Sequence, residues 1–247
     1  MRELVLFTLF APLGSMGGLA VGERRTGMTR PARSAVLGLV AAALGIDRHD
    51  EESHAALDHG YGVAQRVVHT GRLVQDYHTV QTPAANRGRT WPTRRAELAE
   101  PTLETLLSLR EYRAEPHVTA ALWARPNAPH ALPNLVSALL RPRFTLSFGR
   151  KACPLGLPPN PRTMTGETLV AAFDQFDADM PMAERTLRKE LGFTTPSGML
   201  IAADRDAESW LGRPISRIER RRDRVVSRKR WQFDLRDELI ILVKEQG

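Results

Sequence analysis

The alternation of apolar runs and breaker residues predicts the first two elements of this chain. Residues 4–10 form a short apolar run that proline and glycine close, which is typical of a buried β-strand. Residues 35–45 form a longer apolar run, with Ser34 placed to cap the start of a helix and Gly45 to end it. Because apolar residues surround nearly the whole circumference of this helix, we expect it to be sandwiched inside the protein.

Four arginines precede this helix, and they indicate a possible ligand at its start. The free amides and positive potential of a helix start suit a phosphate, and arginine side chains strengthen the attraction. The plainer interpretation is a buried helix whose flanking arginines are only solvated. Both interpretations stay open for Arg24, Arg25, Arg30 and Arg33.

The next stretch predicts a loop and then two strands. Residues 49–59 are acidic and dotted with histidine at spacings that fit no metal-ligand pattern, so we expect a solvated loop. Residues 61–69 and 72–80 are rich in β-formers and are separated by Thr70 and Gly71, which is typical of a short hairpin.

Residues 82–107 change character and predict an inserted, flexible arm. Their central part is polar, basic and rich in breakers. Arginines around one tryptophan can clamp a single nucleic-acid strand by charge and stacking, whereas the plainer interpretation is an exposed loop. The candidate residues are Arg87, Arg89, Trp91 and Arg94.

Regular structure resumes after the arm and completes a recognisable order. The pattern predicts a strand over residues 117–124, a helix over 132–140 and a strand over 143–148. With the earlier elements, the order is strand, helix, strand, strand, helix, strand. This is the α+β, ferredoxin-like order that RNA-recognition domains share, although the aromatic pattern of an ordinary RNA-recognition motif is missing.

A proline-rich segment at residues 157–161 predicts a boundary between two parts. We expect a ferredoxin-like domain over residues 1–156, with the arm inserted, and a smaller β-rich part over residues 157–247. The second part should contain a helix near residues 167–176 and a short strand near 198–202.

The end of the chain is strongly basic. Residues 217–230 hold eight basic side chains, a run that is often only a solvated face. Apolar residues alternate with the charges, and residues 239–243 are strand-like, so the run should belong to a folded β-rich tail.

Composition favours a polyanionic partner. The 247 residues carry 35 Lys and Arg against 28 Asp and Glu, a net charge of +7. Most of the positive charge is arginine, which binds phosphate bidentately and stacks on bases, so nucleic acid is the favoured partner. The single Cys153 excludes an internal disulfide and a multi-cysteine zinc site and fits a reducing cytoplasm. We expect no membrane span, no metal and no cofactor, and we interpret the apolar start as a strand and not a signal peptide.

Five stretches together resemble the CasD family of type I-E CRISPR Cascade complexes, which belongs to the RAMP superfamily. They occur in the family's order and spacing, from residue 4 to about 158, with a fainter echo at residues 231–233 and Arg236. The stretches are residues 11–15, residues 33–39 with 42–46, residues 76–80, residues 110–112, and residues 142–144 with 149–155.

The resemblance implies a non-catalytic subunit that holds the 5′ handle of the crRNA. It also implies a ferredoxin-like domain, a thumb formed by the arm, and a smaller C-terminal β-rich part. The implied partners are the crRNA, the backbone subunit CasC, the large subunit CasA and, through the assembled complex, target DNA. The implied RNA contacts are Arg24, Arg33, Ser34, His78, Arg110, Tyr112, Arg150 and Lys151.

Two positions depart from the family's usual pattern. Met16 stands where a tryptophan is usual, so base stacking at that position is in doubt, although methionine can still pack there. Ala32 replaces the usual threonine and removes one hydroxyl near the helix start.

Two other function classes stay open. A metal-independent endoribonuclease could use Tyr77, His78 and Lys151 as base, acid and cation for attack by a 2′-hydroxyl. A structural assembly subunit would use its basic surface for protein contacts. That third class predicts that handle binding survives the loss of Arg33 and Arg150.

Overall fold

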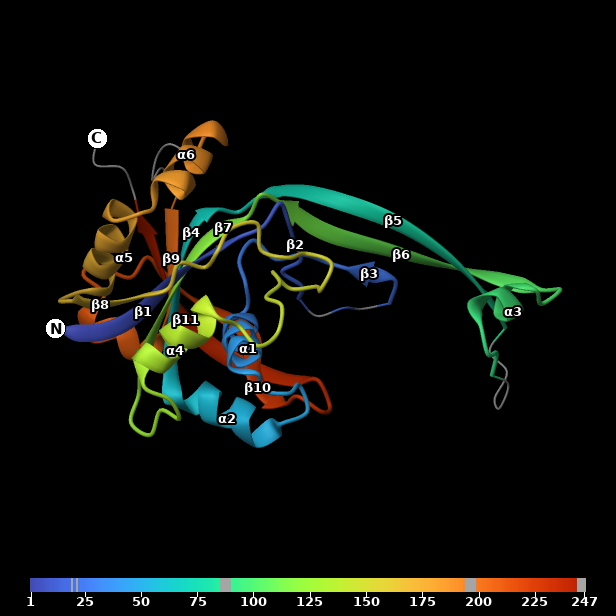
Figure 1. The fold of residues 1–247 in the computed structure, drawn as a ribbon, viewed down its shortest axis with the longest axis horizontal. Helices are drawn as coiled ribbons and strands as arrows, with labels where there is room; N and C mark the ends of the chain where they lie inside the picture. The colour runs from blue at the N-terminus through green and yellow to red at the C-terminus, as the bar shows by residue number, and fades with distance from the viewer. Residues whose placement is uncertain (19, 21, 85–89, 194–198, 244–247) are drawn as a thin grey trace.

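The chain folds as a mixed α/β structure dominated by antiparallel sheet, with a rounded body and a long arm (Figure 1). The computed structural model describes residues 1–18, 20, 22–84, 90–193 and 199–243. The body is built on one large sheet, whose strands are β1 Arg2–Phe10, β4 Tyr61–His69, β7 His117–Ala124, β8 Arg162–Gly166, β9 Met199–Asp204, β10 Arg217–Ser227 and β11 Gln232–Val243.

A second, smaller sheet forms the arm and its root. Its strands are β2 Leu13–Gly14, β3 Arg24–Arg25, β5 Arg72–Pro83 and β6 Leu103–Ala114. The helices are α1 Arg33–Leu44, α2 Glu51–Gly60, α3 Arg94–Leu98, α4 Leu132–Leu140, α5 Leu169–Ala178 and α6 Met182–Glu190, with a 3₁₀ turn η1 at Arg205–Trp210.

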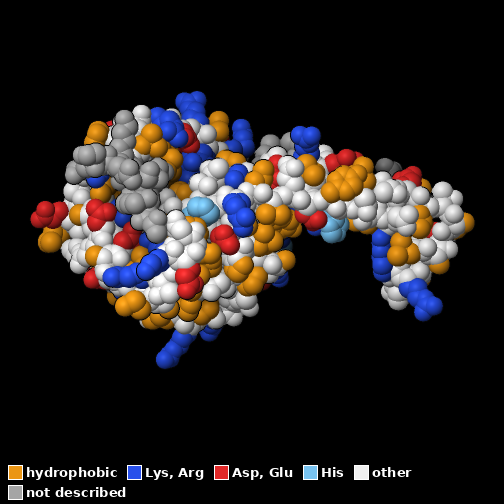
Figure 2. All heavy atoms as spheres, turned by 90° about the horizontal axis from the view of Figure 1, so that it is seen from above, with side chains coloured by type: hydrophobic (Ala, Val, Ile, Leu, Met, Phe, Trp, Pro, Cys, Tyr) orange, Lys and Arg blue, Asp and Glu red, His pale blue; other side chains and the backbone are white. Residues whose placement is uncertain are grey.

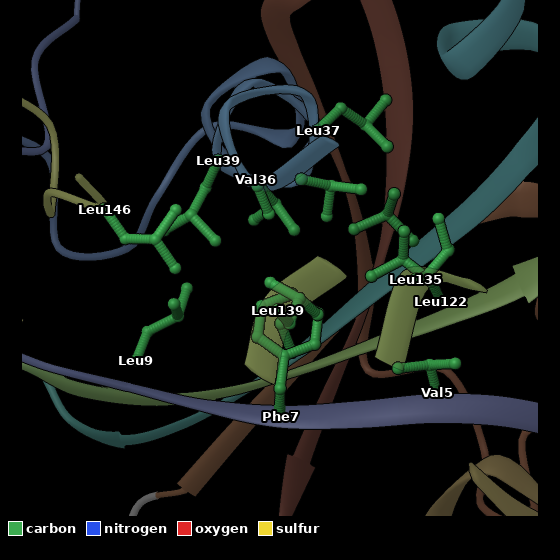
Figure 3. Packing of buried hydrophobic residues seen from close by; sticks show 14 of the residues in the cluster. Val5, Phe7, Leu9, Val36, Leu37, Leu39, Leu122, Leu135, Leu139 and Leu146 are labelled. Carbon is green, nitrogen blue, oxygen red and sulfur yellow. The ribbon is translucent and has the colours of Figure 1, made fainter. Parts of the chain in front are cut away.

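The large sheet runs β10-β11-β9-β4-β7-β1-β8, with antiparallel neighbours throughout. Strand β1 is buried on both faces because its alternate side chains enter two different cores. Phe7 packs with α1 and α4 on one face (Figure 3), and Leu6 packs with α5 on the other. The first strand that the sequence predicts is therefore confirmed as a central strand.

The predicted buried helix is confirmed as α1, but its first residues differ from the prediction. Val36, Leu37 and Val40 are buried, and Gly45 ends the helix in the left-handed conformation at φ 80°. The prediction that Ser34 caps the helix is wrong. The N-cap is Ala32, which makes no side-chain cap, and Ser34 lies within the first turn.

The prediction of a solvated loop over residues 49–59 is also wrong, because residues 51–60 form helix α2. The Asp50 side chain accepts a hydrogen bond from the Ser53 amide at 3.0 Å, which caps the helix start. Glu51 and Glu52 lie in the first turn, where their negative charges interact favourably with the positive end of the helix dipole. The composition of this stretch suggests a loop, but its acidic residues lie at the start of α2 and stabilise the helix there.

Residues 61–69 and 72–80 are confirmed as strands, but the predicted hairpin between them is wrong. Strand β4 pairs with β7 and β9, whereas β5 pairs with β6. The chain turns at Gly71, which has φ 78°, and β5 leaves the large sheet to start the arm.

The strand predicted over residues 143–148 is replaced by irregular structure. The amides of Arg143 and Phe144 donate to the carbonyls of Ala43 and Ala42 at 3.0 and 3.1 Å. The segment therefore satisfies the last carbonyls of α1 and cannot join a sheet there. Strand β8, which pairs with β1, occupies that edge of the sheet.

The remaining predicted elements agree with the structure. The predicted strand over 117–124 and helix over 132–140 are β7 and α4, and the helix near 167–176 is α5. The described part of the predicted strand near 198–202 lies in β9, and the basic tail forms β10 and β11.

The arm is a two-stranded ribbon that projects from the body (Figures 1 and 2). Strands β5 and β6 pair continuously from Arg72 opposite Ala114 to Pro83 opposite Leu103. Residues 82–84 and 90–107 of the predicted insertion supply its outer end, where α3 packs on β5. Within the described residues, none of the helices is long and apolar enough to cross a membrane.

Replacing Leu135 with alanine should destabilise the body, because this α4 side chain is fully buried in the core beside α1. A leucine-to-alanine change in a core costs about 2–5 kcal/mol of unfolding free energy. Denaturant unfolding would measure the loss. Leu140→Ala on the same helix is the control, because Leu140 is 62% exposed and its loss should cost little. Equal losses for both variants would contradict the assigned packing.

Candidate nucleic-acid interface

The residues that the sequence predicts as RNA contacts fall into two places in the structure. Arg33 and Ser34 lie at the start of α1, inside the body. The others lie in exposed or half-buried positions around the root of the arm: Arg24, His78, Arg110, Tyr112, Arg150 and Lys151.

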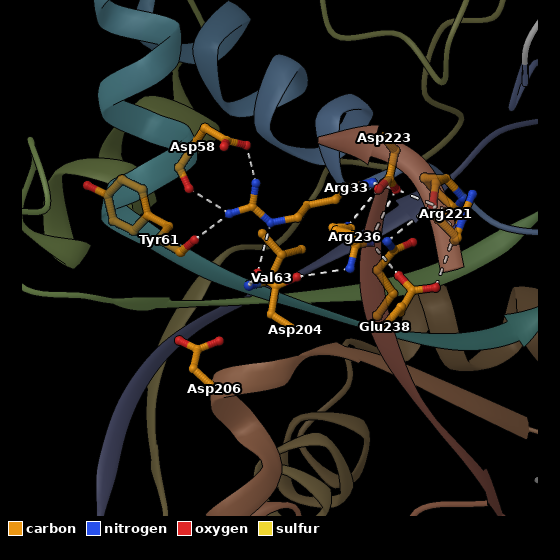
Figure 4. A network of polar contacts seen from close by, with 12 residues as sticks. Arg33, Asp58, Tyr61, Val63, Asp204, Asp206, Arg221, Asp223, Arg236 and Glu238 are labelled. Atoms are coloured by element: carbon orange, nitrogen blue, oxygen red, sulfur yellow. Dashed lines mark hydrogen bonds and ion pairs between the residues drawn. The ribbon is translucent and has the colours of Figure 1, made fainter. Parts of the chain in front are cut away.

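Arg33 is held inside the protein (Figure 4). Its side chain is 3% exposed, and its guanidinium makes four hydrogen bonds. The acceptors are the Asp204 carboxylate at 2.8 Å, the Asp58 carboxylate, and the carbonyls of Asp58 and Tyr61 at 2.7 and 2.8 Å. In this conformation the side chain is engaged with the protein and does not face a ligand.

A carboxylate occupies the helix start where the sequence suggests a phosphate. The backbone amide of Arg33 donates to Asp223 of β10 at 2.8 Å. Asp223 also accepts two bonds from Arg236, with Nε at 2.6 Å and Nη2 at 3.1 Å. The positive end of α1 is thus neutralised from within the chain, so the hypothesis of a phosphate there is corrected.

The network continues through Asp204 and Glu238. Asp204 accepts from Arg33, Arg125 and Arg236 and from the Val63 amide. Glu238 accepts from Arg236 at 2.6 Å and also pairs with Arg30. This buried network links α1 to strands β4, β9, β10 and β11 (Figure 4).

The charges of the network shift its pKa values. Burial alone would raise the pKa of Asp223, but Arg236 and the hydrogen bonds from it outweigh burial and hold that pKa below its ordinary value. Burial alone would lower the pKa of Arg236, and the charges of Glu238, Asp223 and Asp204 hold it above its ordinary value. Both groups are therefore stabilised in their charged forms.

At the root of the arm, the strand register places several predicted contacts on one face. In the β5–β6 ribbon, Asp76 lies opposite Arg110 and His78 lies opposite Ser108. Tyr112 lies two residues from Arg110 on β6 and so shares its face. We call this the Tyr112 face of the ribbon.

Arg150 joins the Tyr112 face from a different segment. Its guanidinium carbon lies 4.7 Å from the centre of the Tyr112 ring, a cation–π contact. The segment is held close to residue 15, since a side chain at Gly149 would lie 1.7 Å from the Ser15 carbonyl oxygen. Gly149 has φ 96°, so glycine is required there.

Polar groups on this face make few hydrogen bonds among the described residues. Within the described residues, the buried Nη1 of Arg150 makes no hydrogen bond. Arg110 donates from Nε to the Ser108 hydroxyl at 3.0 Å. His78 Nδ1 lies 3.2 Å from Asp76. Lys151 is exposed in the same loop as Arg150.

The opposite face of the ribbon carries a different set. Tyr77 follows Asp76 on β5 and therefore points away from His78. Its side chain is 63% exposed. Arg24 on β3 lies beside Leu109 and so also belongs to this opposite face, whereas Arg25 lies beside Arg110. The base and acid of the endoribonuclease hypothesis are thus placed on different faces.

The outer end of the arm holds two of the remaining candidates, Trp91 and Arg94. Trp91 donates from its indole nitrogen to Glu100 at 3.0 Å. Arg94 pairs with Glu97 at 2.6 Å at the start of α3. Arg87 and Arg89 lie outside the described residues.

Two other sequence features have structural positions. Met16, which replaces the family's usual tryptophan, is buried in the core beside α1. Cys153 is a buried free thiol, and burial raises its pKa. Within the described part of the chain, no group of histidine, cysteine, aspartate or glutamate could hold a metal ion.

Replacing Asp223 with asparagine should destabilise the fold by about 3–5 kcal/mol near neutral pH, because it leaves Arg236 and the helix start without their carboxylate.

The depressed pKa means that Asp223 contributes stability above about pH 4, and this contribution is lost as pH falls through the folded-state value. Denaturant unfolding between pH 7 and 3 should therefore show a steeper acid loss for the natural chain than for Asp223→Asn. Asp179→Asn, an exposed change, should leave the profile unaltered. Parallel profiles for the natural chain and Asp223→Asn would contradict the assigned network.

Comparisons with known proteins agree in their result. The family model described as "CRISPR-associated protein (Cas_Cas5)" matches residues 4–236. "CRISPR system Cascade subunit CasD" of Escherichia coli (strain K12) is 35% identical over 170 residues, which cover 64% of this chain and 70% of that protein.

Solved structures share the fold. A chain of a "CRISPR RNA-guided surveillance complex" superposes with a TM-score of 0.57 at 21% identity, over 97% of this chain and 89% of that one. A "Crystal structure of Cas protein" gives 0.54 at 21% identity, over 96% and 94%. From the family match and the identity to CasD, the chain belongs to the Cas5 family of CRISPR-associated proteins, of the CasD type.

Proposed function

We infer that this protein is a non-catalytic crRNA-binding subunit of a type I-E Cascade complex and that it caps the 5′ handle of the guide RNA. The observation that carries this inference is the Tyr112 face, where Tyr112, Arg110 and His78 lie on one face of the ribbon and Arg150 contacts the Tyr112 ring from a separate loop. The type of complex follows from the similarity to the CasD subunit.

The Tyr112 face has the chemistry that a single RNA strand requires. Aromatic rings stack on bases, and arginine both stacks and pairs with phosphate. Arg150 lies over Tyr112, where its planar guanidinium adds a positive charge and a stacking surface. Lys151 and Arg110 supply further positive charge beside the ring.

In this proposal the ribbon acts as a thumb that lies along the guide. Trp91 and Arg94 at its outer end, and Arg87 and Arg89 from the same stretch of sequence, would contact the RNA or the adjacent CasC subunit. CasA and, through the assembled complex, target DNA are the other proposed partners. The cytoplasm is the proposed location.

The body would be a ferredoxin-like domain with an extended sheet. The adjacent strands β8-β1-β7-β4, with α1 and α4 on one face, support that topology. We keep residues 1–156 and 157–247 as proposed units. The second unit supplies β8, the last strand of the ferredoxin-like order, and adds β9, β10 and β11 to the same sheet.

Three of the proposed contacts take revised positions. Arg24 lies on the ribbon face opposite Tyr112, so it would contact a neighbouring protein subunit and not the guide RNA. Arg33 and Ser34 are buried, so they would support the interface by anchoring α1 and not by touching RNA. The placement of Tyr77 and His78 on opposite faces supports a binding role over catalysis.

Replacing Tyr112 with alanine should weaken binding of RNA that carries the repeat-derived 5′ handle by about tenfold, because loss of one stacked base costs about 1–3 kcal/mol. Arg150→Ala should weaken binding and reduce the steepness of the log affinity against log salt plot by about 0.7, the value of one phosphate contact on a single strand. Fluorescence anisotropy with handle RNA and a scrambled handle, across a salt series, would measure both effects.

Tyr77→Ala is the matched control, because it removes an exposed tyrosine from the other face of the same ribbon. Its affinity should equal that of the natural chain. Equal losses for Tyr77→Ala and Tyr112→Ala would contradict the proposed face. Specific cleavage of repeat RNA in the presence of a chelator, abolished by His78→Ala, would support the endoribonuclease instead.

A further inference from the structure

The turn that joins β10 to β11 carries an exposed aromatic side chain that the arm interface does not use. This turn, residues 227–231, is called the β10–β11 tip. In Figure 1 the tip and the arm extend toward the same side of the body. Trp231 at the tip is 55% exposed.

A carboxylate from α2 holds the tip in a defined conformation. Glu51 accepts from the Ser227 hydroxyl at 2.5 Å and from the Lys229 amide at 3.1 Å. The Arg230 amide donates to the Ser227 hydroxyl at 3.1 Å. The hydrogen bond from Ser227, helped by the Lys229 amide and charge, lowers the pKa of Glu51, so the carboxylate stays ionised at neutral pH.

Trp231 sits in this turn with an unusual backbone conformation. Its φ is 55°, in the left-handed region that bulky residues rarely adopt. Strain of this kind persists where the surrounding structure enforces it, and it is concentrated at functional sites. Here it presents a large aromatic ring to solvent.

The ring is also held by its neighbours. The Arg48 guanidinium carbon lies 4.6 Å from the Trp231 ring centre, and that of Arg228 lies at 5.8 Å. Phe233 meets the ring edge to face, with centres 5.3 Å apart. Because these contacts already hold the ring in place, stacking of a planar ligand on it costs little conformational entropy.

Positive charge surrounds the exposed ring. Arg228, Lys229 and Arg230 are consecutive, and Lys229 and Arg230 are exposed. Arg230 makes no ion pair within the described residues. Arg228 donates to the Ser34 carbonyl at 2.9 Å and so ties the tip to α1.

We propose that the β10–β11 tip is a second binding site for single-stranded nucleic acid, separate from the Tyr112 face. One base stacks on Trp231, and the flanking phosphates pair with Lys229 and Arg230. An exposed aromatic ring held beside consecutive cations matches the alternation of bases and phosphates along a single strand. The charge complementarity favours nucleic acid over a protein partner.

The test uses the full chain and a fluorescent 12-nucleotide oligouridine that lacks the handle. Trp231→Gly removes the ring while glycine adopts the positive φ without strain, so the turn is retained. Anisotropy should show binding weakened about tenfold, whereas Trp231→Phe, which keeps a stacking ring, should retain most of the affinity. Alanine at Lys229 and at Arg230 should each reduce the steepness of the salt plot by about 0.7.

The controls test whether the loss of binding is specific to the tip. Arg141→Ala removes an exposed positive charge at the end of α4 and should leave oligouridine binding unchanged. Because the probe lacks the handle, failure of the proposed handle binding does not alter this readout. Thermal melts that match the natural chain would show that Trp231→Gly is folded.

Equal oligouridine affinity of Trp231→Gly and the natural chain would overturn the proposal. If the basic variants alone weaken binding, charge and not stacking acts at the tip, and the proposed site is wrong. If none of the tip variants changes nucleic-acid binding, the tip is a surface for a protein partner and the proposal is likewise overturned.

Discussion

The buried ion-pair network around Asp204 is the interaction on which the rest of the structure depends. One carboxylate accepts from Arg33, Arg125 and Arg236, which come from α1, the segment after β7, and β11. Leaving any one of these charges unpaired inside the protein would cost several kcal/mol, so the elements that carry them are fixed together. The last strands of the chain are thereby locked to its first helix, and the large sheet becomes one unit.

This network also divides the arginines into two populations. Four arginines form ion pairs with carboxylates inside the body: Arg30, Arg33, Arg221 and Arg236. The count of 35 Lys and Arg therefore overstates how many basic side chains can face a ligand, whereas the buried pairs cancel within the net charge of +7. The basic residues outside include Arg150, which covers Tyr112 at the root of the arm, and Lys229 and Arg230 at the β10–β11 tip. Position in the fold, and not the density of arginine in the sequence, decides which residues can meet RNA.

Local pattern predicted the elements well and their long-range partners poorly. The apolar run of α1 and the helix over 132–140 are visible because burial repeats at helical spacing within a single segment. The predicted hairpin of residues 61–69 and 72–80 does not form, because both strands pair with strands that are distant in sequence. Strand β4 pairs with β7, and β5 pairs with β6. The sequence stretch that begins at Arg33 likewise suggested a phosphate site because its partner, Asp223, lies 190 positions later. The sequence did contain a signal of buried ion pairs. Arg221 and Asp223, and likewise Arg236 and Glu238, lie two positions apart in a strand, which places opposite charges on the same face.

In the proposed function, one face of the β5–β6 ribbon holds the guide RNA. Ultraviolet cross-linking of crRNA to the assembled complex, followed by mass spectrometry of the peptide adducts, would identify the side chains that touch the RNA. The structure predicts adducts at Tyr112 and His78, which share that face, and none at the exposed Tyr77 one residue away on the other. Adducts confined to Tyr77, with Tyr112 and His78 unmodified, would contradict the claim.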